Sequence, residues 1–273
     1  FLYSGYDAVF ADLGFGTGSF NVRGYFVFIK GPGRDYVLLS FAPVDLYEAY
    51  HDTLLSCLDS FQLLEMGCRS PGPVSQFYYP LNGAGDSGNN GTEIINLKMN
   101  NKELPVLVDA NEMEASQVVI EREARILTQY QKAGEALFIK AWRRYYRLIY
   151  RDNYSRLTEI LPFIFKAYQL ETEANKPVPG APVDEEAAVA ALLDWIQGFE
   201  YERTGTLSDL TSPLKAAYTM AGDCDSRALL FTIFAHHLEI DALLLVSLRF
   251  AHSAVGLYTQ EASGARISYQ GRE

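Results

Sequence analysis

Cysteine is scarce in this chain of 273 residues, which contains only Cys57, Cys68 and Cys224. Small secreted domains that depend on disulfides need several pairs, so this chain has no disulfide framework. At most, Cys57 could pair with Cys68, which would leave Cys224 as a free thiol. The fold must therefore be stabilised by a hydrophobic core, for which a hydrophobic content of 48% is sufficient.

Long apolar runs and an excess of basic residues are also missing. No run of 18 or more apolar residues occurs, so the sequence offers no candidate for a membrane-spanning helix. The 34 acidic residues exceed the 23 basic ones and give a formal net charge of −11. This balance argues against an extended surface for nucleic acid or anionic lipid. The chain begins at Phe1 rather than Met, as expected of a processed or trimmed product.

Residues 1–66 are predicted to form a small α+β module. Three stretches alternate apolar with small or polar residues between glycine-rich turns, a pattern typical of antiparallel strands. They are residues 6–10, 25–29 and 36–41. A helix is expected over residues 46–61, with Asp45 as its cap and Glu48 completing a capping box. The Gly-x-Gly pattern at residues 14–18 is interpreted as a turn rather than a phosphate loop, because no βαβ unit surrounds it.

A loop-rich region and a helical region are predicted next. Residues 67–112 begin with a loop and end in a β-hairpin, whose strands are expected at residues 93–99 and 104–108. Residues 113–180 have helical periodicity, with a break or kink expected at Pro162. This region ends in a proline-rich linker, which predicts a domain boundary.

One helical segment, residues 142–151, is dense in arginine and aromatic residues. A basic aromatic helix can bind nucleic acid, but arginine side chains also cover a hydrophobic core by packing along tyrosine and tryptophan rings. In a chain this acidic, the structural interpretation is favoured. No nucleic-acid partner is expected, and protein partners are possible through residues 1–180.

Residues 181–273 contain the stretch that carries chemistry. A helix is predicted to begin at the cap Asp184, and a second helix begins within the sequence Gly-Asp-Cys-Asp at residues 222–225. An apolar stretch at residues 241–250 predicts a buried strand, and His252 lies at its exit. A cysteine at a helix start and a histidine after the next strand are the parts of a thiol nucleophile and its base.

Cys224 is expected in the first turn of the second helix, with Gly222 at its start and Asp223 as its cap. There the unsatisfied N–H groups and the helix dipole favour the thiolate and lower its pKa, and the same N–H groups can receive an oxyanion. The flanking carboxylates of Asp223 and Asp225 oppose this effect. The separation between Cys224 and His252 is enough for one helix and a return strand, which would bring the imidazole beside the sulfur.

These elements together resemble the bacterial transglutaminase-like superfamily over about residues 187–257. The shared features are a tryptophan-bearing helix, a proline before the motif, Gly-x-Cys-x-x-x-Ala at a helix start, and a histidine on the next strand. In this chain they are Trp195, Pro213, residues 222–228 and His252. The resemblance implies a papain-like α+β core in which Cys224 is the nucleophile and His252 the general base and acid.

The resemblance also implies a third catalytic residue, an acid on a strand beyond the histidine. Glu273 is the only carboxylate near the expected distance, and it ends the sequence. Either the orienting acid lies beyond Glu273 or activity depends on the Cys–His pair, and without an orienting acid a loss of activity by orders of magnitude is expected. Trp195 is interpreted as a core residue rather than an oxyanion donor. No cofactor is expected, and the Cys and His spacing matches no metal site.

Two functions are compatible with these residues. The first is a cysteine hydrolase or acyltransferase that acts on a protein or peptide amide through a thioester. Hydrolysis is favoured over cross-linking, because no feature of the sequence builds an amine-acceptor site. The second is a catalytically impaired scaffold or binding protein in a bacterial envelope assembly, which the missing acid and the long region before the core favour. The expected location is the periplasm or cell envelope, with the cytoplasm as the alternative.

Overall fold

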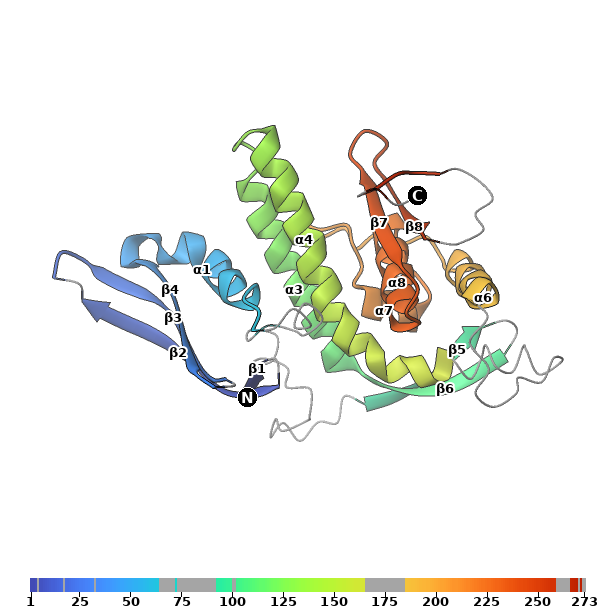
Figure 1. Ribbon diagram of the computed structural model, residues 1–273, viewed down its shortest axis with the longest axis horizontal. Helices are drawn as coiled ribbons and strands as arrows, with labels where there is room; N and C mark the ends of the chain where they lie inside the picture. Colours follow the sequence, from blue (N-terminus) through green and yellow to red (C-terminus); the bar gives the residue numbers. More distant parts are fainter. Residues whose placement is uncertain are drawn as a thin grey trace. The chain divides into compact units, whose positions relative to one another are not determined.

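A computed structural model describes residues 1–3, 5–16, 18–31, 33–63, 72, 92–99, 102–164, 185–258, 266–269 and 271. The chain has a mixed α+β fold, as predicted (Figure 1). Its elements group into two compact units that are discontinuous in sequence. Unit 1 contains residues 1–91, 110–155 and 206–208, and unit 2 contains residues 92–109, 156–205 and 209–273.

Unit 1 begins with an antiparallel sheet in the order β1-β2-β3-β4. Its strands are β1 (Leu2–Tyr3), β2 (Tyr6–Gly16), β3 (Asn21–Lys30) and β4 (Asp35–Pro43). The three strands predicted from the sequence lie within β2, β3 and β4, which are longer than expected. The prediction of a turn at residues 14–18 is wrong for its first part: Gly14 pairs with Arg23 and Gly16 with Asn21, so pairing continues β2 through this glycine-rich stretch.

Helix α1 (Val44–Asp59) covers one face of this sheet and packs against β3 and β4. The buried core between them contains Tyr3, Ala8, Tyr25, Val27, Ile29, Tyr47, Leu55 and Leu58. The helix begins two residues earlier than predicted, and the capping box at Asp45 is not formed. Pro43 occupies the N-cap position and makes no side-chain cap hydrogen bond, because β4 runs directly into α1. Asp45 lies in the first turn instead, where its charge suits the helix dipole.

Two long helices, α3 (Ala110–Gln129) and α4 (Glu135–Arg156), complete unit 1. After α4 the chain forms a 3-10 turn, η2 (Leu157–Ile160), and helical conformation resumes at residues 161–164. The expected break therefore precedes Pro162, which lies early in the new helical stretch, where its missing N–H is tolerated. The proline-rich linker lies outside the described residues. None of the helices described is both long enough and apolar enough to cross a membrane.

Buried charges join α1, α3 and α4 within unit 1. The guanidinium of Arg122 lies 2.7 Å from a carboxylate oxygen of Asp59 and 3.0 Å from one of Glu123. Arg144 also pairs with Glu123, and Arg151 donates to the backbone carbonyl of Asp59. Burial by itself would lower the pKa of Arg122, but the two carboxylates raise it above its ordinary value, so the side chain stays charged. Arg144 and Arg151 of the 142–151 segment thus bind buried groups of unit 1, in line with the structural interpretation of this segment.

After η2 and residues 161–164, the described part of unit 2 contains two hairpins and three further helices. They are β5 (Thr92–Met99) with β6 (Lys102–Asp109), α6 (Glu185–Gln197), α7 (Pro213–Thr219), α8 (Cys224–His237), and β7 (Ala242–Ser247) with β8 (His252–Leu257). Every residue from 228 to 235 is buried, and α8 packs against α6, α7, β7 and β8. A helix buried on all sides belongs at the centre of its domain. The start of α8 is therefore held by packing from several elements.

The four consecutive segments expected from the sequence are distributed over these two units. The helices predicted for residues 113–180 group largely with residues 1–66, whereas the hairpin of residues 67–112 groups with residues 181–273. Periodicity along the chain locates elements, but the elements that share a core are decided by long-range packing.

The substitution Glu123→Gln should destabilise unit 1. It removes one of the two carboxylates beside the buried Arg122 and the partner of Arg144. Breaking a buried ion pair costs about 3–5 kcal/mol, which chemical denaturation followed by circular dichroism would measure. The control is Asp12→Asn, which removes the exposed Arg23–Asp12 pair and should cost less than about 1 kcal/mol. Equal losses in the two variants would contradict this account.

Candidate functional site

The candidate site lies at the start of α8, where Asp223 is the N-cap. Its Oδ1 accepts hydrogen bonds from the backbone N–H of Ser226 at 2.8 Å and from the Ser226 hydroxyl at 2.6 Å. Burial raises the pKa of Asp223, although these hydrogen bonds lower it. The predicted cap is confirmed. Because the side chain is buried and its oxygen is occupied by α8, Asp223 supports the site by orienting the first turn.

Gly222 lies where α8 begins, and the residues packed around it leave little room for a side chain. A Cβ at this position would lie 3.0 Å from the Cβ of Ser226, which is tighter than normal packing. The Gly222 N–H donates to the carbonyl of Glu200 at 3.0 Å. Arg227 joins the start of α8 to the segment before it, because its guanidinium donates to the backbone carbonyls of Gly222 at 3.0 Å and Phe199 at 2.6 Å. The glycine and the arginine of the motif therefore determine where the helix starts.

The Cys224 thiol lies in the first turn of α8, as predicted, and is partly buried. The backbone N–H of Ser253 on β8 lies on the side of the sulfur and acts to lower the thiol pKa. The sulfur also lies 3.8 Å from Oδ1 of Asp225, and the Ser253 hydroxyl donates to this same oxygen. The thiol is thus enclosed between its own helix and the first residues of β8.

The electrostatics of this thiol differ from the expectation. Burial raises the pKa of Cys224, because the charged form is disfavoured away from water. The Ser253 N–H lowers the pKa, but the carboxylates of Asp225 and Asp223 raise it further. The prediction of a lowered thiol pKa is therefore wrong for this conformation, and Cys224 is a neutral thiol at neutral pH.

His252 directly precedes Ser253 in β8, but the His252 side chain does not face Cys224. The predicted strand at residues 241–250 ends at Ser247, and His252 opens β8 as the partner of Ser247. Side chains alternate along a strand, and Ser253 faces Asp225 on α8. His252 therefore faces the opposite side of the hairpin, where it is exposed. Within the described ranges, no hydrogen bond joins the His252 imidazole to the Cys224 sulfur.

Trp195 is a core residue, in agreement with its favoured interpretation. It is buried, and its ring packs against Phe199 and Phe234 with centroid distances of 5.0 and 6.0 Å. The indole N–H donates to the carbonyl of Lys98 at 3.0 Å. Since this N–H is the only donor of the side chain, Trp195 has no group left for an oxyanion.

The remaining candidate residues add little to this site. Glu273 and Cys68 lie outside the described residues, and Cys57 and Cys224 are free thiols. In the part of the chain that the structure describes, no group of His, Cys, Asp and Glu residues is arranged to hold a metal ion. Ser253 was missed by the sequence analysis. Its position one residue after His252 would have placed it on the other face of the strand.

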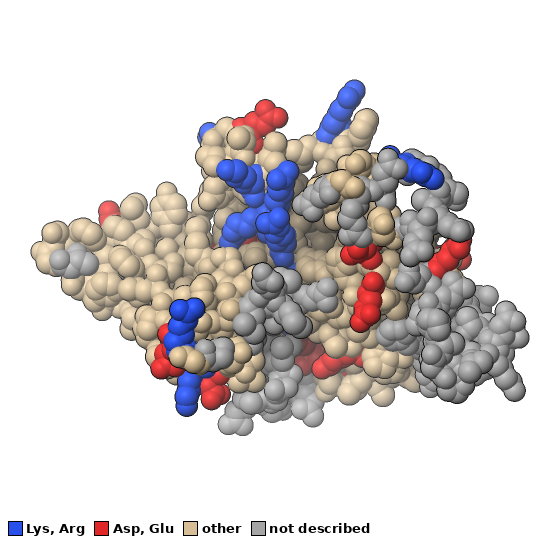
Figure 2. Space-filling view, in the orientation of Figure 1, with Lys and Arg blue, Asp and Glu red and all other residues tan. Residues whose placement is uncertain are grey.

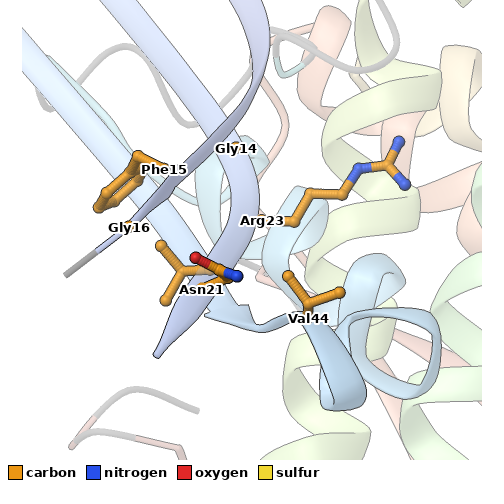
Figure 3. Close-up of a pocket in the computed structure, with 7 residues that line it drawn as sticks. Gly14, Phe15, Gly16, Asn21, Arg23 and Val44 are labelled. Atoms are coloured by element: carbon orange, nitrogen blue, oxygen red, sulfur yellow. The ribbon is translucent and has the colours of Figure 1, made fainter. Parts of the chain in front are cut away.

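An open groove of about 400 Å³ lies in unit 1, at the end of the β2–β3 hairpin (Figure 3). Its lining residues are Gly14, Phe15, Gly16, Asn21, Val22, Arg23 and Val44. Figure 3 shows Phe15 and Arg23 projecting in opposite directions. Arg23 is paired with Asp12 at 2.9 Å, and the lining contains no nucleophile. The groove therefore does not compete with Cys224 as a catalytic site.

Comparison with known proteins gives no family for this chain. No family model, no curated protein and no solved structure matches it.

Alkylation of Cys224 should require a higher pH than that of an ordinary cysteine, whose pKa is about 8.5. Burial and two nearby carboxylates stabilise the neutral thiol, so the reactive thiolate forms late. Iodoacetamide labelling over a pH series, read by peptide mass spectrometry, measures the midpoint. Asp225→Asn should move the midpoint to lower pH, because it removes a negative charge beside the sulfur. The exposed control Asp194→Asn on α6 should not move it, and an unchanged midpoint in Asp225→Asn would refute the assignment.

Proposed function

We propose that this protein is a transglutaminase-like cysteine hydrolase or acyltransferase that acts on a protein or peptide amide. The observation that carries the proposal is the hydrogen bond from the Ser253 hydroxyl to Asp225, the residue beside Cys224. It places the strand that bears His252 against the helix start that bears the thiol. This is the order of elements that the resemblance implies, with a nucleophile at the start of a buried helix and a histidine on the neighbouring strand.

The chemistry would be acyl transfer through Cys224. His252 removes the thiol proton, and the thiolate attacks the amide carbonyl carbon. The carbon–nitrogen bond then breaks, the amine leaves with the proton from His252, and a thioester remains on Cys224. His252 next activates a water molecule, whose attack releases the carboxylic acid and restores the thiol. Glu273, or an acid beyond it, would orient His252 and fix its tautomer.

Catalysis requires His252 to turn toward α8. It belongs to the terminal pair of the β7–β8 ladder, so hydrogen bonds hold it on one side only. The preceding residue, Ala251, has a φ of 44°, a left-handed conformation that is unfavourable for a residue with a Cβ. A strained turn next to the candidate base is a place where the backbone can rearrange. A substrate that binds the rearranged conformation more tightly would increase its population.

A second candidate function is a scaffold or binding protein whose transglutaminase-like core does not catalyse. The raised pKa of Cys224 and the outward position of His252 favour it. In this case residues 1–180 would supply the contacts with partners in a bacterial envelope assembly. The periplasm or cell envelope is the proposed location under both functions.

A peptidyl electrophile distinguishes the two candidates. If the protein is an enzyme, the electrophile should label the partly buried Cys224 faster than the exposed Cys57. General acid–base catalysis contributes about 10²–10⁴-fold, so His252→Ala should slow the labelling of Cys224 by a factor in that range. The partly exposed His51→Ala, in unit 1, is the control and should leave the rate unchanged. Mass spectrometry of the labelled peptides gives both rates in one sample.

The opposite outcome supports the scaffold. If Cys224 reacts no faster than Cys57, and His252→Ala leaves its rate unchanged, the two residues do not form a catalytic pair. Glu273→Gln adds a test of the third residue, because loss of an orienting acid should reduce the rate without affecting the labelling of Cys57.

A further inference from the structure

The sheet of unit 1 is apolar on the face that α1 does not cover. Side chains alternate along each strand, so the residues between the inward-facing positions point away from α1. We define the outer face as Val9, Ala11, Leu13 and Phe15 on β2, Phe26 and Phe28 on β3, and Val37, Leu39 and Phe41 on β4. Strand pairing arranges them in rows that run Val9–Phe28–Val37, Ala11–Phe26–Leu39 and Leu13–Gly24–Phe41. Every side chain in these rows is apolar.

Several of these side chains are strongly exposed. The exposed fractions are Val9 59%, Phe15 38%, Val37 61%, Leu39 45% and Phe41 44%. Together they form a patch on the order of 500 Å², which is in the upper range for the largest apolar patch of a monomeric protein. A strand such as β3, apolar toward α1 and on the outer face, has the pattern of a strand buried on both faces. A second layer on the outer face would complete that burial.

Among the described residues of β2, β3 and β4, the charged side chains that alternate onto the outer face lie at one end. Lys30 and Asp35 pair across β3 and β4 at that end, with Asp7 in the next position along β2. The opposite end has the exposed rings of Phe15 and Phe20 beside the β2–β3 turn. Figure 2 likewise shows few Lys, Arg, Asp or Glu atoms over this sheet, whereas basic atoms gather over the long helices. The middle of the outer face is therefore suited to bind another uncharged, apolar surface.

We propose that the outer face is a dimer interface, on which the same face of a second copy packs as a second sheet. Each copy has a formal charge of −11, so association of two copies is favoured at a surface with few charges, and the outer face is such a surface. A two-fold interface uses one self-complementary patch on both partners, and this patch consists throughout of aliphatic and aromatic side chains. The inner faces of two packed sheets have the same composition.

The distribution of charge also selects an orientation. If the strands of the two copies run in opposite directions, the charged end of one face lies over the uncharged end of the other. Like charges then do not meet. Leu39, in the middle row, lies near Leu39 of the second copy, and Val37 lies near Phe41 of the second copy. The two patches together bury on the order of 1,000 Å², which is at the lower limit for a specific interface, so the dimer dissociates on dilution.

Sedimentation velocity on the full chain over a concentration series tests the proposal. The chain should be a dimer at high concentration and a monomer after dilution. Val37→Asp should raise the dissociation constant at least about tenfold, because it buries an unpaired charge in the interface. The matched control is Leu107→Asp on β6, a change at a leucine that is 62% exposed but lies outside the outer face. It should leave the dissociation constant unchanged, and circular dichroism should show both variants folded.

The double variant Val37→Asp/Phe41→Lys tests the orientation. In the antiparallel arrangement Asp at 37 meets Lys at 41 of the second copy, so the double variant should dimerise more tightly than Val37→Asp alone. Failure to recover would overturn the antiparallel arrangement.

Three outcomes would overturn the dimer itself. One is a wild-type chain that stays monomeric at every concentration; flotation of that monomer with lipid vesicles would assign the face to a membrane surface instead. Another is a monomer in which the outer-face side chains, such as Phe41, are protected from hydroxyl-radical oxidation, which would assign the face to another part of the same chain. The third is a dimer that Val37→Asp does not weaken, which would place the interface elsewhere.

Discussion

The start of α8 is determined by close packing at Gly222 and by the cap that Asp223 forms on Ser226. A Cβ at position 222 would crowd Ser226 of the same helix and Ala216 of α7, and loss of the cap would leave the first N–H groups without partners. These two adjacent residues make Cys224 the first residue of α8. Every property of the thiol that bears on function depends on this placement.

At this position two opposing effects act on the thiol. The helix start favours a thiolate, whereas partial burial and two carboxylates favour the neutral form, and in this conformation burial has the larger effect. The hydrogen bond from Ser253 to Asp225 holds β8 against α8 and at the same time keeps a carboxylate beside the sulfur. The contact that brings the histidine-bearing strand to the site is thus also one that keeps the thiol neutral. A conformational change at the β7–β8 turn would alter both.

Unit 1 uses polar and apolar packing in different places. Between α1, α3 and α4, the guanidinium of Arg122 lies buried between carboxylates. Such a network is stable only while every charge keeps its partner, so it specifies how the helices meet more than it adds to stability. The sheet has the opposite character, since both of its faces are apolar and α1 covers only one. The buried charges between the helices are therefore paired, while the outer face of the sheet is apolar and exposed.

The sequence by itself determined the features that depend on near neighbours. Three strands of unit 1, the hairpin strands, the long helices, the Asp223 cap and the place of Cys224 follow from alternation, helical periodicity and cap chemistry, which act over a few residues. Boundaries were less predictable: α1 starts at Val44 because β4 runs straight into it, and β2 continues through Gly16 because β3 pairs with it. Tertiary structure alone decided which elements share a core, how burial shifts the pKa of Cys224, and which of two adjacent residues faces the sulfur. The last point has a simple cause: side chains alternate along a strand, so a difference of one residue in register exchanges Ser253 for His252.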